Sequence, residues 1–170
     1  KLLHQDIEGQ TILVTGAGGS IGSELCSEIL RDSPKILVLL ELNEFSLYHV
    51  ERKFRSLSSI PIVPCLGSVQ DSELLKHLLR DHKINTVYHA AAYKHVPLVE
   101  ENPLQGLRNN ALGTQSLIEK CIEAEVNSFV LISTDKAVRP TNVMGASKRI
   151  AEMIVQDTAR HFPERRIGIV

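Results

Sequence analysis

The sequence has no excess of charge of either sign. Its 170 residues include 19 Lys and Arg against 20 Asp and Glu, so the formal net charge is -1 with the histidines neutral. Proteins that bind nucleic acid or anionic membranes usually present a basic surface, whereas the basic residues here are scattered. The densest cluster, residues 52–55, is expected to lie on a solvated helix face. The charge distribution therefore argues against nucleic acid as a partner.

Cysteine is scarce, and long hydrophobic runs are absent. Cys26, Cys65 and Cys121 lack the spacing of a metal site, so we expect free thiols in a reducing compartment and no metal centre. No run approaches the roughly 18 apolar residues that suggest a membrane-spanning helix, and no signal peptide opens the sequence. We expect a cytoplasmic segment without direct membrane contact, either soluble or part of a membrane-anchored protein.

Strand and helix signals alternate along the chain. With 43% hydrophobic and 23% charged residues, the sequence can bury an ordinary core. The alternation predicts an α/β fold, a doubly wound parallel sheet with helices on both faces. The expected strands are residues 11–15, 35–40, 61–66, 84–89, 128–133 and 166–170, and the expected helices are residues 21–30, 44–57, 71–82, 103–125 and 146–161. We expect a single domain over residues 1–170 that stops inside its sixth strand.

A glycine-rich turn follows the first expected strand. Gly16, Gly19 and Gly22 have GxxGxxG spacing, with a strand before them and a helix after them. Glycine lets the backbone approach a pyrophosphate closely, and the amides at the start of a helix can bind its phosphates. The residues assigned to the pyrophosphate are Gly16, Gly18, Gly19, Ser20, Ile21 and Gly22. The pattern predicts a Rossmann-like dinucleotide site.

The second expected strand leads into Glu41, about 20 residues beyond the glycines. A carboxylate there can accept hydrogen bonds from both hydroxyls of the adenosine ribose and repels a 2′-phosphate, which favours NAD over NADP. Asn43 is assigned to the same end of the cofactor. Because Asn43 and Glu44 follow directly, a helix-capping or solvated Glu41 is the alternative.

Small and polar residues follow the next two strands. In a parallel sheet the ligand lies beyond the carboxyl ends of the strands, so these residues should approach the glycine turn. The candidates for cofactor contact are Ser68, Val69, Ala90, Ala91 and Ala92. Small side chains let a flat cofactor lie against the backbone, and a tight packing corner is the alternative. We interpret His89 as a satisfied histidine at a strand end and not as a catalyst.

The fifth expected strand leads into a chemically rich segment. Residues 133–136 read Ser-Thr-Asp-Lys, a hydroxyl, a carboxylate and an amine in succession. Met144 and Lys148 stand four residues apart near the start of a helix, so they should share one helical face. A surface salt bridge at the strand end and a solvated helix lysine are the alternatives.

Three pieces of the chain resemble the extended short-chain dehydrogenase/reductase superfamily. They are TGAGGSIG at residues 15–22, HAAAYKHVPLVE at residues 89–100 and STDKAVRPTNVMGASK at residues 133–148. Within the superfamily the sequence resembles the UDP-N-acetylglucosamine 4,6-dehydratases of bacterial polysaccharide synthesis, the CapD- and WbpM-like group. The resemblance implies an NAD-dependent hydro-lyase that acts on a UDP-sugar. It also implies a homo-oligomer whose substrate-binding region follows this chain.

The resemblance assigns roles to individual residues. Thr134 would contact the sugar C4 oxygen, Asp135 would be the acid and Lys136 the base of water elimination. Lys148 would hold the nicotinamide ribose, and Met144 replaces the usual catalytic tyrosine. Asp135 would have to be protonated and Lys136 neutral, or the pair would share one proton. The resemblance also places Asn110 behind the active site. Candidates for substrate contact are Asn142 and, after the fourth expected strand, Lys94, His95 and Glu100, for which ordinary loop polarity is the alternative.

Two other functions fit the same residues. A nucleotide-sugar 4-epimerase shares the cofactor and the C4 oxidation, but it needs no base at C5 and normally uses the missing tyrosine. A non-catalytic module would bind NAD without turnover.

Overall fold

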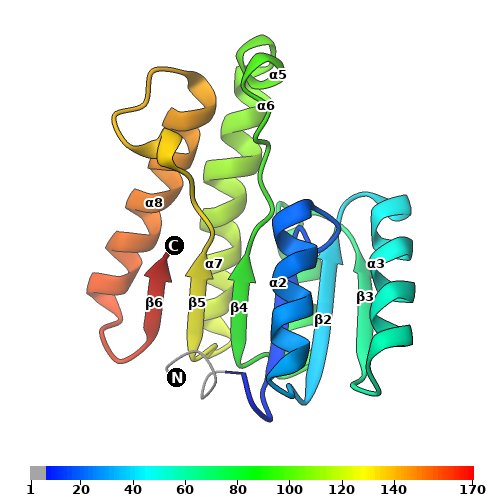
Figure 1. Ribbon diagram of the computed structural model, residues 1–170. Coiled ribbons are helices and arrows are strands. Elements are labelled where there is room, and N and C mark those ends of the chain that lie inside the picture. The colour runs from blue at the N-terminus through cyan, green and yellow to red at the C-terminus, as the bar shows by residue number, and fades with distance from the viewer. Residues whose placement is uncertain (1–6) are drawn as a thin grey trace.

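The computed structural model describes residues 7–170. A six-stranded, fully parallel sheet with the order β3-β2-β1-β4-β5-β6 forms its centre (Figure 1). The strands are β1 Thr11–Thr15, β2 Ile36–Glu41, β3 Ile62–Leu66, β4 Thr86–His89, β5 Ser128–Leu131 and β6 Arg166–Ile169. The strand order reverses between β1 and β4, and ligands bind beyond such a switch point. The predicted Rossmann-like doubly wound sheet is confirmed.

Helices cover the sheet from both sides (Figure 1). The long helices are α2 Ser20–Arg31, α3 Glu44–Leu57, α4 Ser72–Asp81, α7 Gly113–Glu123 and α8 Val143–His161. Successive strand residues point to opposite faces, so Ile12 and Val14 pack with α2 and α3 while Leu13 packs with α4, α7 and α8. The β-branched and leucine-rich strands are therefore buried on both sides around β1.

The expected helix over residues 103–125 is not continuous. It consists of α6 (Pro103–Leu107), a π-helical turn η1 (Arg108–Leu112) and α7, and a short helix α5 (Val96–Glu101) precedes it. Proline suits the first turn of a helix because its missing amide would have no partner there. The π-helical turn carries Asn109 and Asn110, both buried. Helical periodicity predicted the segment but not this interruption.

The helix expected over residues 146–161 begins earlier, at Val143. Asn142 is its N-cap, and the Asn142 side chain accepts a hydrogen bond from the Gly145 amide at 2.8 Å. Asparagine is among the preferred capping residues, so the sequence contained this signal. Within residues 7–170, no helix is at once long and apolar enough to cross a membrane.

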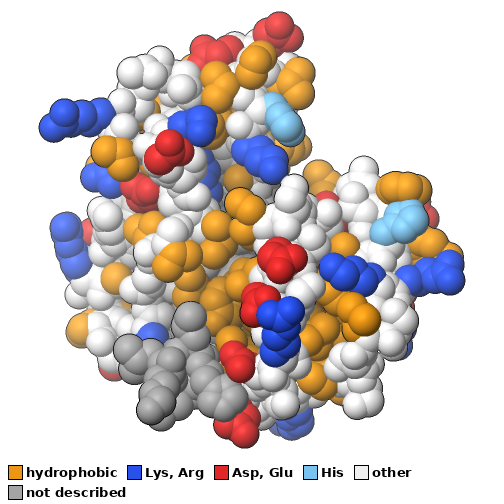
Figure 2. Space-filling model, in the orientation of Figure 1, with side chains coloured by type: hydrophobic (Ala, Val, Ile, Leu, Met, Phe, Trp, Pro, Cys, Tyr) orange, Lys and Arg blue, Asp and Glu red, His pale blue; other side chains and the backbone are white. Residues whose placement is uncertain are grey.

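Charged side chains are interspersed over the face of the molecule shown in Figure 2, with Lys and Arg scattered among Asp and Glu. This agrees with the near-neutral composition.

Candidate functional site

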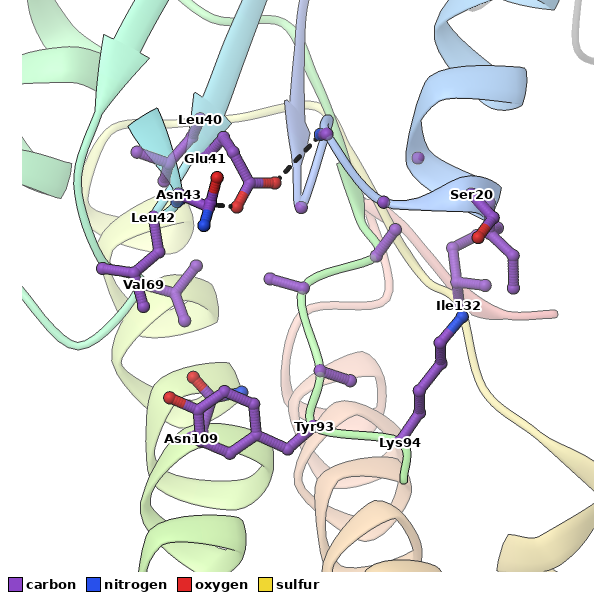
Figure 3. Close-up of a pocket in the computed structure, with 18 of the residues that line it drawn as sticks. Ser20, Leu40, Glu41, Leu42, Asn43, Val69, Tyr93, Lys94, Asn109 and Ile132 are labelled. Carbon is purple, nitrogen blue, oxygen red and sulfur yellow. Dashed lines mark hydrogen bonds between the residues drawn. The ribbon is translucent and has the colours of Figure 1, made fainter. Parts of the chain in front are cut away.

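A cavity of about 590 Å³ opens at the carboxyl ends of the strands (Figure 3). Its volume lies in the range of small-molecule and cofactor sites. The expected site residues on its wall are Gly16, Gly18, Gly19, Ser20, Ile21, Gly22, Glu41, Asn43, Ser68, Val69, Ala90, Ala91, Ala92, Lys94, Thr134, Lys136, Met144 and Lys148. The sheet thus brings together residues from nearly the whole length of the chain.

Other cavity residues were not assigned to the site from the sequence. They are Leu40, Leu42, Ser46, Gly67, Tyr93, Asn109, Ile132 and Ser133. Most are direct neighbours of expected residues, so proximity in sequence was the available signal. Five expected residues lie off the wall, namely His95, Glu100, Asn110, Asp135 and Asn142.

The glycine turn has a backbone that requires glycine. Gly16 has φ +67°, in the left-handed region, and a Cβ at this position would come within 2.7 Å of the Ala91 backbone. Gly19 is the N-cap of α2 and provides no side-chain cap, so the first amides of α2 are left for another acceptor. An anion at a helix N-terminus meets such amides and the positive end of the helix dipole. The turn fits a pyrophosphate group.

Glu41 holds the glycine turn in place from the end of β2. Its Oε2 accepts a hydrogen bond from the Gly18 amide at 2.9 Å, and its Oε1 accepts one from the Asn43 amide at 3.0 Å (Figure 3). Each carboxylate oxygen has a second lone pair, so Glu41 can still accept from two ribose hydroxyls. Asn43, in contrast, caps α3 by accepting from the Ser46 amide at 2.9 Å. The capping role belongs to Asn43 and not to Glu41.

Met144 and Lys148 are buried, and both line the cavity from α8. The predicted shared face is therefore confirmed. The Lys148 ammonium donates a hydrogen bond to the carbonyl of Ile132, at the end of β5, with an N–O distance of 2.7 Å. Burial lowers the pKa of Lys148 to about 8, while the negative charge of Glu152 acts in the opposite direction. The two residues are held at the wall, one apolar and one cationic.

The carboxylate of Asp135 lies outside the cavity. Its side chain is 88% exposed, whereas Lys136 is 52% exposed and lines the wall with Thr134. Asp135 Oδ1 accepts hydrogen bonds from the Thr134 hydroxyl at 3.0 Å and from the Lys136 ammonium at 3.3 Å. These two hydrogen bonds lower the pKa of Asp135. A proton donor needs a raised pKa, so these surroundings favour the carboxylate form of Asp135, and its assignment as the acid stays a prediction.

Asn110 fastens the segment after β4 to α8. Its Oδ1 accepts from the Tyr93 amide at 2.8 Å, and its Nδ2 donates to the Tyr93 carbonyl and to the Ser147 hydroxyl, each at 2.9 Å. All of these contacts are internal, and the π-helical turn η1 directs the side chain into them. Asn110 therefore lies behind the cavity wall, as expected, and it holds Tyr93 in place there.

The expected substrate contacts divide into two groups. Lys94 lines the cavity, and with His95 it also borders an adjoining hollow of about 440 Å³ beside α5. Asn142 is occupied as the cap of α8, and Glu100 accepts a hydrogen bond from the Val143 amide at 2.6 Å. Asn142 and Glu100 therefore stabilise the start of α8 through one side-chain oxygen each, and their assignment to the substrate stays a prediction.

His89 is completely buried between β1, β4 and α7. Its Nδ1 lies 2.6 Å from the Thr15 hydroxyl and its Nε2 lies 2.8 Å from the Thr114 hydroxyl. Because Thr114 donates to the Asn110 carbonyl, it accepts from Nε2–H, and Nδ1 accepts from Thr15. Thr15 in turn accepts from the Ala91 amide at 3.3 Å, next to the cavity. His89 is a satisfied structural histidine, as the sequence predicted.

The neutral form of His89 makes the folded protein sensitive to acid. Burial lowers its pKa from 6.5 to about 3, and the nearby Lys148 charge contributes. As the pH falls, the unfolded chain protonates His89 before the folded protein does. The stability that neutral His89 contributes to folding is therefore present above pH 6.5 and is lost as the pH falls toward 3. We expect roughly 4–5 kcal/mol to be lost over this window. Urea unfolding at several pH values measures it.

Two variants check the assignment of this acid sensitivity. His89→Asn should lose that part of the pH dependence, although its stability at neutral pH falls. His49→Gln, on the exposed side of α3, should keep the wild-type slope. An unchanged slope in His89→Asn would contradict the assignment.

Comparison with known proteins supports the resemblance drawn from the motifs. Residues 12–169 match the family model described as polysaccharide biosynthesis protein. The chain is 47% identical over 157 residues to the capsular polysaccharide biosynthesis protein CapD of Staphylococcus aureus, covering 91% of this chain and 26% of that protein. It is 33% identical over 150 residues to a UDP-N-acetylglucosamine 4,6-dehydratase (inverting) of Campylobacter jejuni, covering 85% of this chain and 42% of that protein.

A solved structure confirms the fold independently. The UDP-Glc/GlcNAc 4-epimerase of Campylobacter jejuni superposes with a TM-score of 0.87 at 24% identity, covering 95% of this chain and 52% of that one. The chain thus spans between a quarter and about half of the proteins that it matches. Because the family model extends from residue 12 to residue 169, the chain belongs to the polysaccharide biosynthesis protein family, within the short-chain dehydrogenase/reductase fold.

Proposed function

We propose that the intact protein is an NAD-dependent nucleotide-sugar 4,6-dehydratase. It would convert UDP-N-acetylglucosamine to a UDP-4-keto-6-deoxy sugar for bacterial surface polysaccharide. The observation that carries the proposal is the meeting of Thr134, Lys136, Met144 and Lys148 with the glycine turn around one cavity. The relatives named as dehydratases and capsule proteins support it.

The cavity suits NAD as the cofactor. The glycine turn and the open amides of α2 suit its pyrophosphate, and the remaining lone pairs of Glu41 suit the adenosine ribose hydroxyls. The negative charge of Glu41 disfavours the 2′-phosphate of NADP. NAD bound there would supply the oxidation at sugar C4 and the later return of hydride to C6.

The residues of the chain move the protons. Elimination of water needs a base for the C5 proton and an acid for the departing C6 hydroxyl, adjacent to each other. We assign both roles to the Asp135–Lys136 pair as a unit that shares one proton once substrate covers it, because interacting groups titrate together. Thr134 would hydrogen-bond the C4 oxygen. Lys148, mostly charged near pH 7, would hold the nicotinamide ribose.

Met144 cannot take the proton of the C4 hydroxyl, because a thioether has no titratable proton. That proton therefore leaves through Asp135 or through water beside Lys148. The absence of a tyrosine at this position also separates the proposal from a 4-epimerase, which would need a base at C4 only.

Turnover of UDP-N-acetylglucosamine deuterated at C5 tests the proposal in the intact protein. We expect a 4-keto-6-deoxy product and loss of the deuterium to solvent, followed by NMR and mass spectrometry. A C4 epimer that keeps its deuterium would support the 4-epimerase, whose fold the chain shares. NAD binding without any product would support the non-catalytic module.

A further inference from the structure

A buried carboxylate with no role in the proposed reaction lies behind the cavity wall. Glu152 on α8 is only 8% exposed. Burial of a carboxylate costs several kcal/mol unless the group is partnered. Glu152 Oε1 accepts a hydrogen bond from the Ser133 hydroxyl at 2.6 Å, and Oε2 accepts one from Arg149 at 2.8 Å. Ser133 itself lines the cavity, so Glu152 is one contact away from it.

Glu152 stands one helical turn after Lys148, so the two side chains leave α8 on the same face. Lys148 donates to the carbonyl of Ile132, and Glu152 accepts from the hydroxyl of Ser133. Two consecutive residues at the end of β5 are therefore held by opposite charges from one helix. The segment 134–136 begins at the next residue, so these contacts fix where it starts.

The charge of Glu152 also acts on Lys148. Burial disfavours the charged ammonium, and Glu152 opposes that effect. The other titratable groups on the cavity wall or next to Lys148 are His89 on β4, Tyr93 and Lys94 after β4, Lys136 on the 3-10 turn η2 (Asp135–Ala137), and Glu41 at the end of β2. Arg149 on α8 pairs with Glu152 itself. His89 is neutral, and the charge that raises the pKa of Lys148 is that of Glu152. Glu152 is thus the anion that supports the charge of Lys148 from its own helix.

We propose that Glu152 is a positioning residue, which holds Ser133 at the entry to segment 134–136 and places a negative charge on the same face of α8 as the Lys148 ammonium. The consequence for catalysis rests on the proposed function. The effect of Glu152 on the charge of Lys148 does not rest on the proposed function, so an experiment can contradict one without contradicting the other.

Glu152→Gln tests the electrostatic part. The amide keeps the size of the side chain and an acceptor for Ser133, but it removes the charge. We expect the titration midpoint of Lys148 to fall by about one pH unit, the effect of removing one unit charge one helical turn away in a partly buried site. The measurement is ¹H–¹³C NMR of ¹³C-lysine-labelled intact protein, with Lys148→Arg for assignment. Glu123→Gln, an exposed carboxylate on α7, is the matched control and should leave the midpoint unchanged.

Ser133→Ala tests the positioning part, because it removes the hydrogen bond and keeps the charge. We expect kcat for the UDP-sugar to fall by roughly 10–100-fold with the Lys148 midpoint and the Kd for NAD unchanged. Glu152→Gln should instead move the alkaline limb of the pH–rate profile to lower pH, and Glu152→Asp should restore it in part.

Two results would overturn the proposal. One is a Lys148 titration midpoint in Glu152→Gln that equals the midpoint of the wild type. The other is a wild-type kcat in Ser133→Ala. If no variant and no wild-type protein turns over the UDP-sugar, the proposed function fails, and the NMR midpoint still decides the role of Glu152.

Discussion

Lys136→Ala is expected to lower the rate of water elimination in the intact protein by about 10²- to 10⁴-fold, the usual loss for a general acid or base. Lys136 lines the cavity, and its ammonium donates a hydrogen bond to the Asp135 carboxylate. Since the side chain is half exposed, its removal should leave the core and the affinity for NAD intact. Release of deuterium from C5 in a single turnover measures the rate, and calorimetry measures NAD binding.

Lys53→Ala is the matched control, because Lys53 is an exposed lysine on α3 far from the strand ends. It should keep the wild-type rate. If the pair acts as a unit, Asp135→Asn should cost about as much as Lys136→Ala, and the double variant little more. A wild-type rate in Lys136→Ala would remove the pair from the mechanism.

Gly22→Ala is expected to destabilise the fold by about 3 kcal/mol or more and to abolish NAD binding. An added Cβ would overlap the carbonyl oxygen of Gly16 and come within 3.1 Å of the Ala17 Cα. These are backbone atoms of the turn between β1 and α2, so they cannot move away from the added Cβ without opening the turn. The Gly16 carbonyl also accepts from the Gly19 amide at 3.1 Å, a bond that an open turn would lose. Urea unfolding and NAD titration measure the two effects.

Gly168→Ala provides the comparison at a glycine without close neighbours. It lies in β6, and nothing stands within 4 Å of an added Cβ. We expect its stability to stay within about 0.5 kcal/mol of the wild type. Equal losses in both variants would show that the close approach at Gly22 is not the cause.

Local pattern was sufficient for the fold and for much of the site. Alternating strand and helix signals allow a parallel sheet covered on both faces, and the ends of its strands meet at one edge. That geometry brought the glycine turn, Glu41 and residues 90–92 to one cavity. The shared face of Met144 and Lys148 followed from a spacing of four on a helix. Each of these inferences uses only residues close in sequence or a general property of such sheets.

By itself, the sequence determined which elements form, which edge of the sheet carries the cavity and which segments reach it. Tertiary structure decided the rest: the π-helical turn that directs Asn110 to Tyr93, the exposure of Asp135, and the contact of Glu152 with Ser133. The reason is that burial, and the hydrogen bonds between residues 17 and 19 positions apart, depend on how helices pack against strand ends. Periodicity along one element carries no information about that packing.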